Sequence, residues 1–254
     1  MTLAATPARE DADVESSSEL YARRFAGPVG QWFLELQARL TLSCLSGLPP
    51  AAMVLDVGGG HAQLAPPLVD AGYQVTVVGS DFSCGRRLAP LTSAGRSRFD
   101  VADLLALPYL DRSFDAVVCY RLLAHSIDWR RLVGELCRVA RHRVVVDYPA
   151  RRSMNVASEV LFRIKSSIER GTTRPFALYG RGEIARAFEA AGFAVTAVRP
   201  QFFLPMALYR LAGSASLARA AEGLAGSLAL TSLFGSPVIA RADRRVDAGD
   251  ARRG

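Results

Sequence analysis

The sequence contains almost no lysine, since Lys165 is the only lysine among 31 basic residues and the rest are arginine. These arginines are scattered, and no aromatic residues alternate with them as platforms for stacking nucleic-acid bases. The net charge of +7 therefore does not predict a nucleic-acid partner. We interpret the basic surface as one that attracts anionic small molecules or lipid headgroups.

Cysteine is scarce as well, and its spacing excludes two kinds of site. None of the four cysteines forms a C-x-x-C pair, which argues against both a disulfide framework and a zinc site. Cys119 and Cys137 lie inside apolar runs that are typical of core elements. We therefore expect reduced thiols, a cytoplasmic protein and no bound metal.

The sequence shows neither a secretory signal nor a clear membrane span. Residues 9–19 are acidic and polar where a signal peptide requires an apolar stretch. Residues 223–240 carry no charge, but they include three glycines and a proline, and a spanning helix needs about 20 predominantly apolar residues. We predict a buried helix and a buried strand there, and a peripheral contact with a membrane surface stays an open alternative.

Short apolar strands alternate with amphipathic helices along most of the chain. The predicted strands are residues 53–57, 73–79, 97–102, 114–120, 142–148, 193–199 and 235–242. The predicted helices are residues 18–46, 62–71, 83–93, 128–140 and 180–191. Apolar strands separated by helices indicate a parallel sheet covered on both faces, with right-handed crossovers. The predicted fold class is α/β, a Rossmann-like, doubly wound, mainly parallel seven-stranded sheet with helical additions.

The chain divides into one domain and two polar ends. Half of the residues are hydrophobic, which is enough for a full core. We predict a disordered leader over residues 1–17, a single domain over 18–242 and a disordered tail over 243–254. The domain comprises an N-terminal helical region (18–50), a core (51–148), a helical insertion (151–180) and an apolar segment (200–232).

The apolar segment 200–232 is interpreted as a lid over the substrate at the carboxyl edge of the sheet. Connections of this length in compact domains are usually functional or disordered. Its composition is too apolar for disorder, and Pro200, Pro205 and Gly213 break it into short pieces.

A glycine-rich turn, LDVGGGHA at residues 55–62, joins the first strand of the core to a helix. Such a turn lets a ligand approach the backbone closely. Dinucleotide sites favour G-x-G-x-x-G, but Gln63 stands where the third glycine would be. Asp56 precedes the turn, where a carboxylate would repel a pyrophosphate and can accept a hydrogen bond from an ammonium group. The turn alone leaves a nucleotide open as an alternative ligand.

Two further carboxylates stand at the ends of neighbouring strands. Asp81 closes the second strand, where it can accept hydrogen bonds from both hydroxyls of a ribose. That feature fits NAD equally well. Asp103 ends the third strand, where it can accept from an adenine amino group while Leu104 packs on the ring. Asp103 therefore discriminates against a dinucleotide.

As a set, these motifs resemble the class I S-adenosylmethionine-dependent methyltransferases, in particular the branch with the ubiquinone and menaquinone biosynthesis enzymes. LDVGGGHA resembles the family's LDxGxGxG, and GSDFS (79–83) resembles its xxDxS. DLLALPYLDRSFDAVVC (103–119) resembles its D-x-x-x-LP-(F/Y)-x-D-x-SFD-x-V-x, and ELCRV (135–139) its E-x-x-R-V. The resemblance covers residues 50–148. It departs from the family at Ala62, which replaces the third glycine, and after Val139, where the usual glycine turn is missing.

The resemblance implies that the cofactor is S-adenosylmethionine and that the chain transfers its methyl group to a small-molecule acceptor. The residues that we expect to bind the cofactor lie at the ends of the first four strands: Asp56, Gly58, Gly60, His61, Asp81, Phe82, Asp103, Leu104 and Tyr120. Two alternatives stay open: a non-catalytic or regulatory protein that binds S-adenosylmethionine, and a nucleotide-dependent oxidoreductase.

The sequence gives less information about the catalytic residues and about the chemical class of the acceptor. Methylation of a hydroxyl or an enol requires removal of a proton, whereas an amine must only arrive neutral. His125 and Tyr148, near the ends of the fourth and fifth strands, are the candidate catalytic residues. The helical additions combine Phe, Leu and Met with arginines, so we expect a lipophilic or aromatic acceptor. The methylated atom and the oligomeric state are not predicted.

Overall fold

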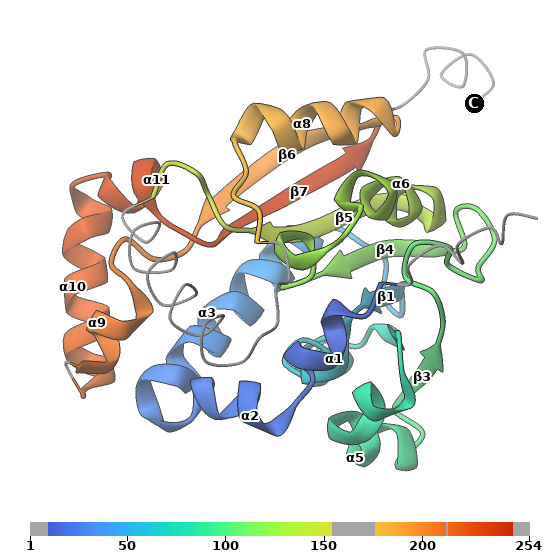
Figure 1. Ribbon diagram of the computed structural model, residues 1–254, viewed down its shortest axis with the longest axis horizontal. Helices are drawn as coiled ribbons and strands as arrows, with labels where there is room; N and C mark the ends of the chain where they lie inside the picture. The colour runs from blue at the N-terminus through green and yellow to red at the C-terminus, as the bar shows by residue number, and fades with distance from the viewer. Residues whose placement is uncertain (1–9, 154–175, 212, 246–254) are drawn as a thin grey trace, which may run out of the picture.

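Seven strands form one sheet in the computed structural model, which describes residues 10–153, 176–211 and 213–245 (Figure 1). The strand order is β3-β2-β1-β4-β5-β7-β6. The strands are β1 (Met53–Val57), β2 (Gln74–Gly79), β3 (Ser97–Val101), β4 (Phe114–Cys119), β5 (Ala140–Tyr148), β6 (Phe193–Pro200) and β7 (Val238–Arg244). All pairs among β1–β5 are parallel, and β7 runs antiparallel to both of its neighbours. The predicted fold class is confirmed.

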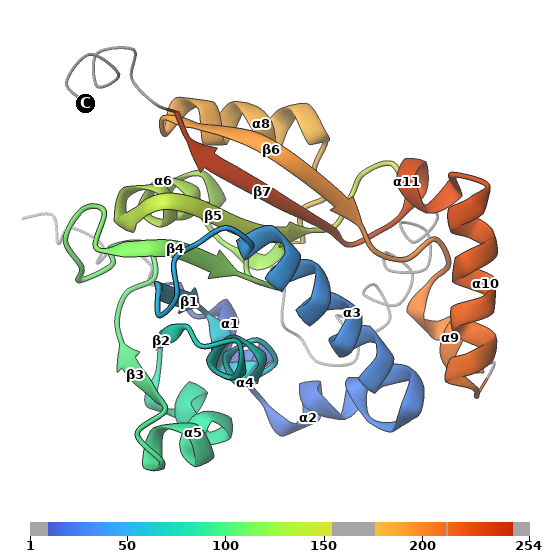
Figure 2. The same cartoon turned by 180° about the vertical axis from the view of Figure 1, so that it is seen from behind.

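Helices cover both faces of the sheet (Figures 1 and 2). One face carries α6 (Trp129–Val139) and α8 (Arg181–Ala190), whose apolar side chains share a buried cluster with Val117 and Cys119 of β4. The other face carries α3 (Gly27–Leu45) and α4 (Ala65–Asp70), which share a second buried cluster with Val118 of β4. The alternation of neighbouring β4 side chains between the two clusters follows from the pleat of the strand.

The N-terminal end differs from the predicted disordered leader. Residues 1–9 lie outside the described residues, but α1 spans Ala12–Ser16, and Ala12, Asp13 and Ser16 are buried. The prediction was wrong because it took polar residues as a sign of disorder. Two carboxylates of this segment are buried and are held by hydrogen bonds from distant parts of the chain. Asp13 accepts from Ser80, and Glu10 accepts from the backbone N–H of Ile127.

Three other predicted boundaries shift. The long helix expected over 18–46 is divided into α2 (Glu19–Ala22), the 3-10 turn η1 (Arg23–Phe25) and α3, whose first residue, Gly27, has a positive φ of 78° that interrupts the helical conformation. The helix expected over 83–93 is a 3-10 helix, η3 (Phe82–Leu88), followed by α5 (Ala89–Ser93). At the other end, β7 continues to Arg244, into the predicted disordered tail, whose residues 246–254 lie outside the described residues.

The apolar segment 200–232 is helical and packs against α3. It forms α9 (Met206–Leu211), α10 (Ala215–Ser227) and the start of α11 (Leu230–Phe234), beside the N-terminal half of α3 (Figure 2). Phe202 stacks edge-on against Phe33 with ring centroids 4.6 Å apart, and Tyr209 packs against Trp32 at 5.6 Å. The predicted helical insertion falls mostly on residues 154–175, outside the described residues. No helix in the described parts of the chain is long and apolar enough to cross a membrane.

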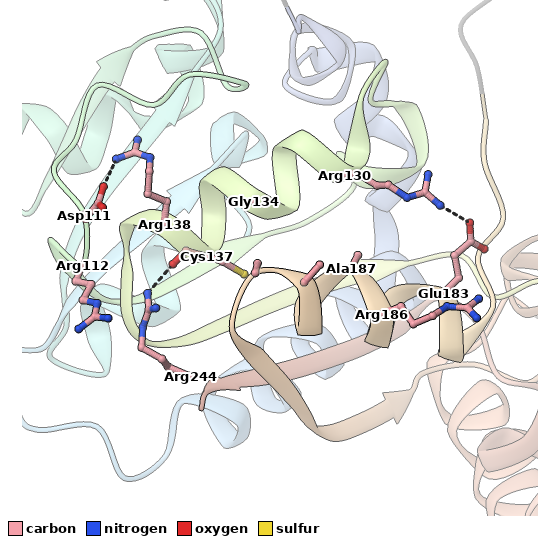
Figure 3. A pocket seen from close by; sticks show the side chains of 12 residues that line it. Asp111, Arg112, Arg130, Gly134, Cys137, Arg138, Glu183, Arg186, Ala187 and Arg244 are labelled. Carbon is pink, nitrogen blue, oxygen red and sulfur yellow. Dashed lines mark hydrogen bonds and ion pairs between the residues drawn. The ribbon is translucent and has the colours of Figure 1, made fainter. Parts of the chain in front are cut away.

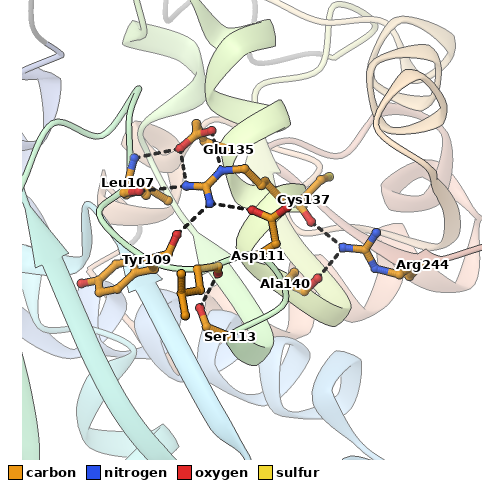
Figure 4. Close-up of polar contacts among 10 residues, drawn as sticks. Leu107, Tyr109, Asp111, Ser113, Glu135, Cys137, Ala140 and Arg244 are labelled. Atoms are coloured by element: carbon orange, nitrogen blue, oxygen red, sulfur yellow. Dashed lines mark hydrogen bonds and ion pairs between the residues drawn. The ribbon is translucent and has the colours of Figure 1, made fainter.

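The E-x-x-R-V motif holds the connection between β3 and β4 in place (Figure 4). The Arg138 guanidinium donates to the carbonyl oxygens of Leu107 and Tyr109 and to the Glu135 and Asp111 carboxylates, at 2.7–2.9 Å. Glu135 also accepts from the N–H of Leu107 at 2.8 Å. The motif therefore acts on the loop that follows Asp103, without touching the glycine turn.

We predict that Arg138→Met lowers the free energy of unfolding by about 2 kcal/mol, because two partly buried carbonyls and the Glu135 carboxylate lose their donor. Urea denaturation followed by circular dichroism measures this change. Arg131→Met on the same helix is the control, because Arg131 is exposed and its side chain makes no such bonds in the structure. An equal loss of unfolding free energy in the two variants would contradict the role of Arg138 in holding the β3–β4 connection.

Candidate active site

A buried carboxylate stands at the carboxyl end of the central strand β1. Asp56 is almost completely buried, and its Oδ2 has no hydrogen-bond partner among the described residues. Burial raises the pKa of Asp56 to about 7. An unpartnered buried carboxylate is costly, so it indicates a position at which a cationic or hydrogen-bond-donating ligand group is expected.

The glycine turn after β1 leaves no room for side chains. A Cβ at position 59 would collide with the Asp56 carboxylate, and one at position 60 would collide with Ser17 and Cys84. Gly58 has a φ of 72°, which favours glycine. Ala62 also has a positive φ, of 60°, which gives a physical reason for the glycine that methyltransferases resembling this chain carry there.

The other two expected carboxylates cap the turns at which β2 and β3 end. Asp81 is exposed and accepts a hydrogen bond from the N–H of Ser83 at 2.8 Å. Asp103 accepts from the N–H of Leu105 at 2.9 Å, and Leu104 beside it is fully buried. Phe82 is 81 % exposed and is available to pack on a ligand. Because β1, β2 and β3 are neighbours and parallel, the three carboxylates share one edge of the sheet.

Tyr120 and His61 lie with Asp56 around a small cavity of about 10 Å³. The Tyr120 hydroxyl is 2.6 Å from the Thr41 hydroxyl of α3, which fixes its ring. His61 is buried, and its nitrogens have no hydrogen-bond partner among the described residues. Burial, followed by the charge of Arg121, lowers the pKa of His61 to about 3, so the imidazole is neutral. The structure thus brings together Asp56, Gly58, His61 and Tyr120 from the expected set.

The N-terminal segment lies directly over the glycine turn. Asp13 of α1 is fully buried, and its carboxylate accepts from the N–H of Ser80 at 2.8 Å and from its hydroxyl at 2.5 Å. A Cβ built on Gly58 would lie 3.5 Å from the Asp13 Cβ. Residues 10–17 therefore fill the space above the turn, and only the small cavity beside Asp56 is left.

A second cavity, of about 350 Å³, opens next to the first. Aromatic and apolar side chains from η1, α3 and the 200–211 segment form its walls, and Arg24, Arg121, Arg210, His125 and Asp147 contribute polar groups. Arg121 lines both cavities and follows β4 directly. Its backbone N–H donates to the Asp147 carboxylate at 2.6 Å. Ligands of open α/β sheets bind at such a carboxyl edge, where the strand order reverses between β1 and β4.

The two candidate catalytic residues lie in different places. His125 lines the larger cavity, where its ring is 5.7 Å from that of Phe176. Tyr148 faces the opposite side of the sheet, in the cluster with α8, and its ring packs edge-on against Tyr179 at 6.3 Å. The structure does not place Tyr148 at either cavity.

Asp147 was missed by the sequence reasoning as a site residue, and Arg121 was considered for its position beside Tyr120 but was not among the expected cofactor-binding residues. Asp147 lies in the larger cavity, one residue before Tyr148 on β5, and burial raises its pKa to about 6. A signal was present, because an acidic residue that ends an apolar strand, as in VVVDY, is unusual in a core. Arg121 carried a weaker signal, its position directly after β4.

A further groove lies between α6 and α8, and Figure 3 shows the residues that line it. Its volume is about 730 Å³, and the Arg130–Glu183 ion pair spans the two helices. Asp111 and Arg112 in its wall precede β4, so the groove reaches the amino edge of the sheet, away from the glycine turn. We therefore place the site at the two smaller cavities.

Among the described residues, no group of three or more His, Cys, Asp or Glu side chains has a geometry that could hold a metal ion. All four cysteines are buried and free.

Comparison with known proteins agrees with this arrangement. Residues 55–146 match the family described as methyltransferase domain. The chain carries a class I methyltransferase domain. A demethylmenaquinone methyltransferase of Deinococcus radiodurans is 38 % identical over 90 residues, which cover 34 % of this chain and 37 % of that protein. The chain thus spans well under half of the length of this curated relative.

Solved structures extend the likeness of the methyltransferase domain to nearly the whole chain at the level of the fold. Magnesium protoporphyrin IX methyltransferase from Synechocystis, solved with bound S-adenosylhomocysteine, aligns with a TM-score of 0.61 at 15 % identity over 92 % of this chain and 100 % of that one. Geranyl diphosphate C-methyltransferase from Streptomyces coelicolor aligns with a TM-score of 0.62 at 16 % identity, over 93 % and 86 %.

We predict that Asp56→Asn changes how stability depends on pH. The raised pKa of Asp56 means that the folded protein holds a proton between about pH 4 and pH 7 that the unfolded chain releases, so this contribution to stability is lost as pH rises through 7. The variant lacks this loss. Urea denaturation at pH 5 and pH 8 should therefore show the variant gaining stability relative to the parent at the higher pH. A difference that stays constant with pH would contradict the assigned burial.

Proposed function

We propose that this protein transfers a methyl group from S-adenosylmethionine to a small, lipophilic or aromatic acceptor bound in the 350 Å³ cavity. The observation that carries the proposal is the buried Asp56 carboxylate with its unpartnered Oδ2, at the glycine turn of a methyltransferase domain. S-adenosylhomocysteine and S-adenosylmethionine are bound in the solved structures of the Synechocystis enzyme.

The residues at the carboxyl edge suit each part of this cofactor. The Asp56 carboxylate would accept a hydrogen bond from its ammonium group. Asp81 would accept from the ribose hydroxyls and Asp103 from the adenine amino group, while the exposed Phe82 offers apolar surface to the ring. The fully buried Leu104 offers no such surface in this structure, contrary to expectation. Charge-assisted bonds of this kind are each worth about 1.5–3 kcal/mol.

The chain's contribution to the reaction is alignment and exclusion of water. The cofactor supplies a methyl group on a sulfonium, and transfer is an in-line displacement. Arg121 and the walls of the larger cavity would hold the acceptor beside the glycine turn, and proximity of this kind is worth up to about 7–11 kcal/mol in the best cases. A proton lost by the acceptor can go to His125, as predicted, or to Asp147, whose pKa of about 6 suits a base.

The acceptors of the relatives do not identify the acceptor of this protein. The match to the methyltransferase domain ends at residue 146, and most walls of the larger cavity come from η1, α3 and the 200–211 segment. The expectation of a substrate lid over 200–232 is supported in part by Phe202, Pro205 and Met206, which line this cavity.

The experiment is calorimetry with S-adenosylhomocysteine and with NADH, followed by a screen of apolar acceptors with labelled methyl donor. We expect binding of the first ligand only, and label in at least one acceptor. Binding of NADH alone would favour the oxidoreductase. Binding of S-adenosylhomocysteine without any turnover would favour the regulatory alternative.

We predict that Asp81→Ala weakens binding of S-adenosylhomocysteine by about 2–4 kcal/mol, because two hydrogen bonds to the ribose are lost. Titration calorimetry measures the change. Asp70→Ala is the control, since Asp70 is an exposed acid in an ion pair with Arg96 at the far end of α4. Unchanged affinity of a folded Asp81→Ala variant would remove Asp81 from the site.

A further inference from the structure

The larger cavity carries an excess of positive charge. Arg24, Arg121 and Arg210 line it, and Asp147 is the only acidic side chain among its described lining residues. None of the three guanidinium groups forms an ion pair with a carboxylate in the described parts of the chain. Arg210 instead donates to the backbone carbonyl of Arg24, which ties α9 to η1 at this cavity.

Arg121 is held rigidly at the inner end of this cavity. Its Nη2 donates to Gln37 Oε1 at 3.0 Å, and its guanidinium lies 4.1 Å from the centre of the Phe25 ring. The backbone is fixed by the bond from its N–H to Asp147. Its Nη1 is buried and has no acceptor among the described residues. A buried guanidinium N–H without an acceptor is costly, and an oxyanion would satisfy it.

The opposite walls are apolar. Phe25, Phe33, Phe202 and Met206 enclose the remaining volume. A ligand that matches both parts has an apolar body and one anionic group. We propose that the methyl acceptor is such an amphiphile, with a carboxylate or phosphate bound by Arg121, and with Arg24 and Arg210 attracting it at the cavity.

This inference rests on the proposed function, and it has one rival within the same chemistry. Arg121 also lines the small cavity beside Asp56, so the oxyanion that it binds could be the carboxylate of the cofactor. We assign this oxyanion to the acceptor, because Arg24, Arg210 and the apolar walls line the larger cavity and not the small one.

The test measures binding of octanoate, octyl phosphate and 1-octanol to the parent, Arg121→Met and Arg121→Lys, with S-adenosylhomocysteine titrated separately. We expect both anions to bind the parent at least about tenfold more tightly than the alcohol, the effect of one charge-assisted bond. The difference should vanish in Arg121→Met and return in part in Arg121→Lys. Arg98→Met, at a side chain that is 79 % exposed, is the matched control and should keep it.

Two outcomes would overturn the inference. One is equal affinity of the parent for the alcohol and the anions. The other is a loss of S-adenosylhomocysteine affinity in Arg121→Met with octanoate binding unchanged, which would assign Arg121 to the cofactor. Thermal unfolding establishes that each variant is folded, and failure of the parent to bind S-adenosylhomocysteine would count against the proposed function instead.

A separate observation concerns access to the glycine turn. Asp13 and Ser17 are buried there, and the Asp13 carboxylate accepts hydrogen bonds from the N–H and the hydroxyl of Ser80. Asp13 packs against the position of Gly58, and Ser17 packs against that of Gly60. A ligand that lies on this turn must occupy the same space.

We infer that residues 10–17 close the cofactor site of the free protein and leave it when the cofactor binds. This inference also rests on the proposed function. Because the bonds of Asp13 are broken on binding, they lower the observed affinity for the cofactor.

Asp13→Ala is therefore expected to tighten S-adenosylhomocysteine binding by at least about tenfold. Glu15→Ala is the control, because Glu15 is an exposed acid on the same helix. Hydrogen exchange should show that amides of residues 12–17 lose protection when the parent is saturated. Unchanged or weaker affinity in Asp13→Ala, or unchanged protection, would overturn the inference, whereas a parent that does not bind would count against the function itself.

Discussion

The Asp56 carboxylate is the constraint on which the rest of the site depends, because it is buried near the end of the central strand and one of its oxygens has no partner in the described parts of the chain. Its pKa of about 7 expresses the cost of ionising it there. His61 beside it is neutral and does not compensate its charge. The need for glycine at position 59 follows from it directly, because any side chain there would meet the carboxylate. A fold that keeps such a group gives up stability for the ligand that completes it.

The strand order explains why this carboxylate faces a crevice. The strand order reverses between the parallel strands β1 and β4, so the connections that leave these two strands go to opposite faces and open a gap at their carboxyl ends. Asp56 ends β1 and Arg121 follows β4, one on each side of the gap. The small cavity lies on the side of Asp56, and the large one on the side of the added helices. The part that matches the methyltransferase family and the added helices therefore meet at Arg121.

The sequence predicted most of the sheet because its strands are short apolar runs bounded by turns, which local pattern identifies well. The carboxylates Asp56, Asp81 and Asp103 could be placed for the same reason, since each marks a strand end. The side of the sheet to which a side chain points is harder to predict from the sequence. Tyr148 and Asp147 are neighbours on β5, and because side chains alternate along a strand, only Asp147 faces the larger cavity. Helix α1 was missed because one turn of polar residues has no periodicity. Its stability comes from Ser80 and Ile127, which are distant in sequence.

The charges around Arg121 couple the binding of the two ligands. On the proposed assignment, a sulfonium lies close to Arg121, and two cations in a poorly hydrated site repel each other. An anionic acceptor against Arg121 offsets that repulsion, so each ligand raises the affinity of the site for the other by the same factor. Methyl transfer removes the positive charge from sulfur, and with it the attraction of the anion for the cofactor. The same arrangement that assembles the two substrates thus weakens the hold on the products.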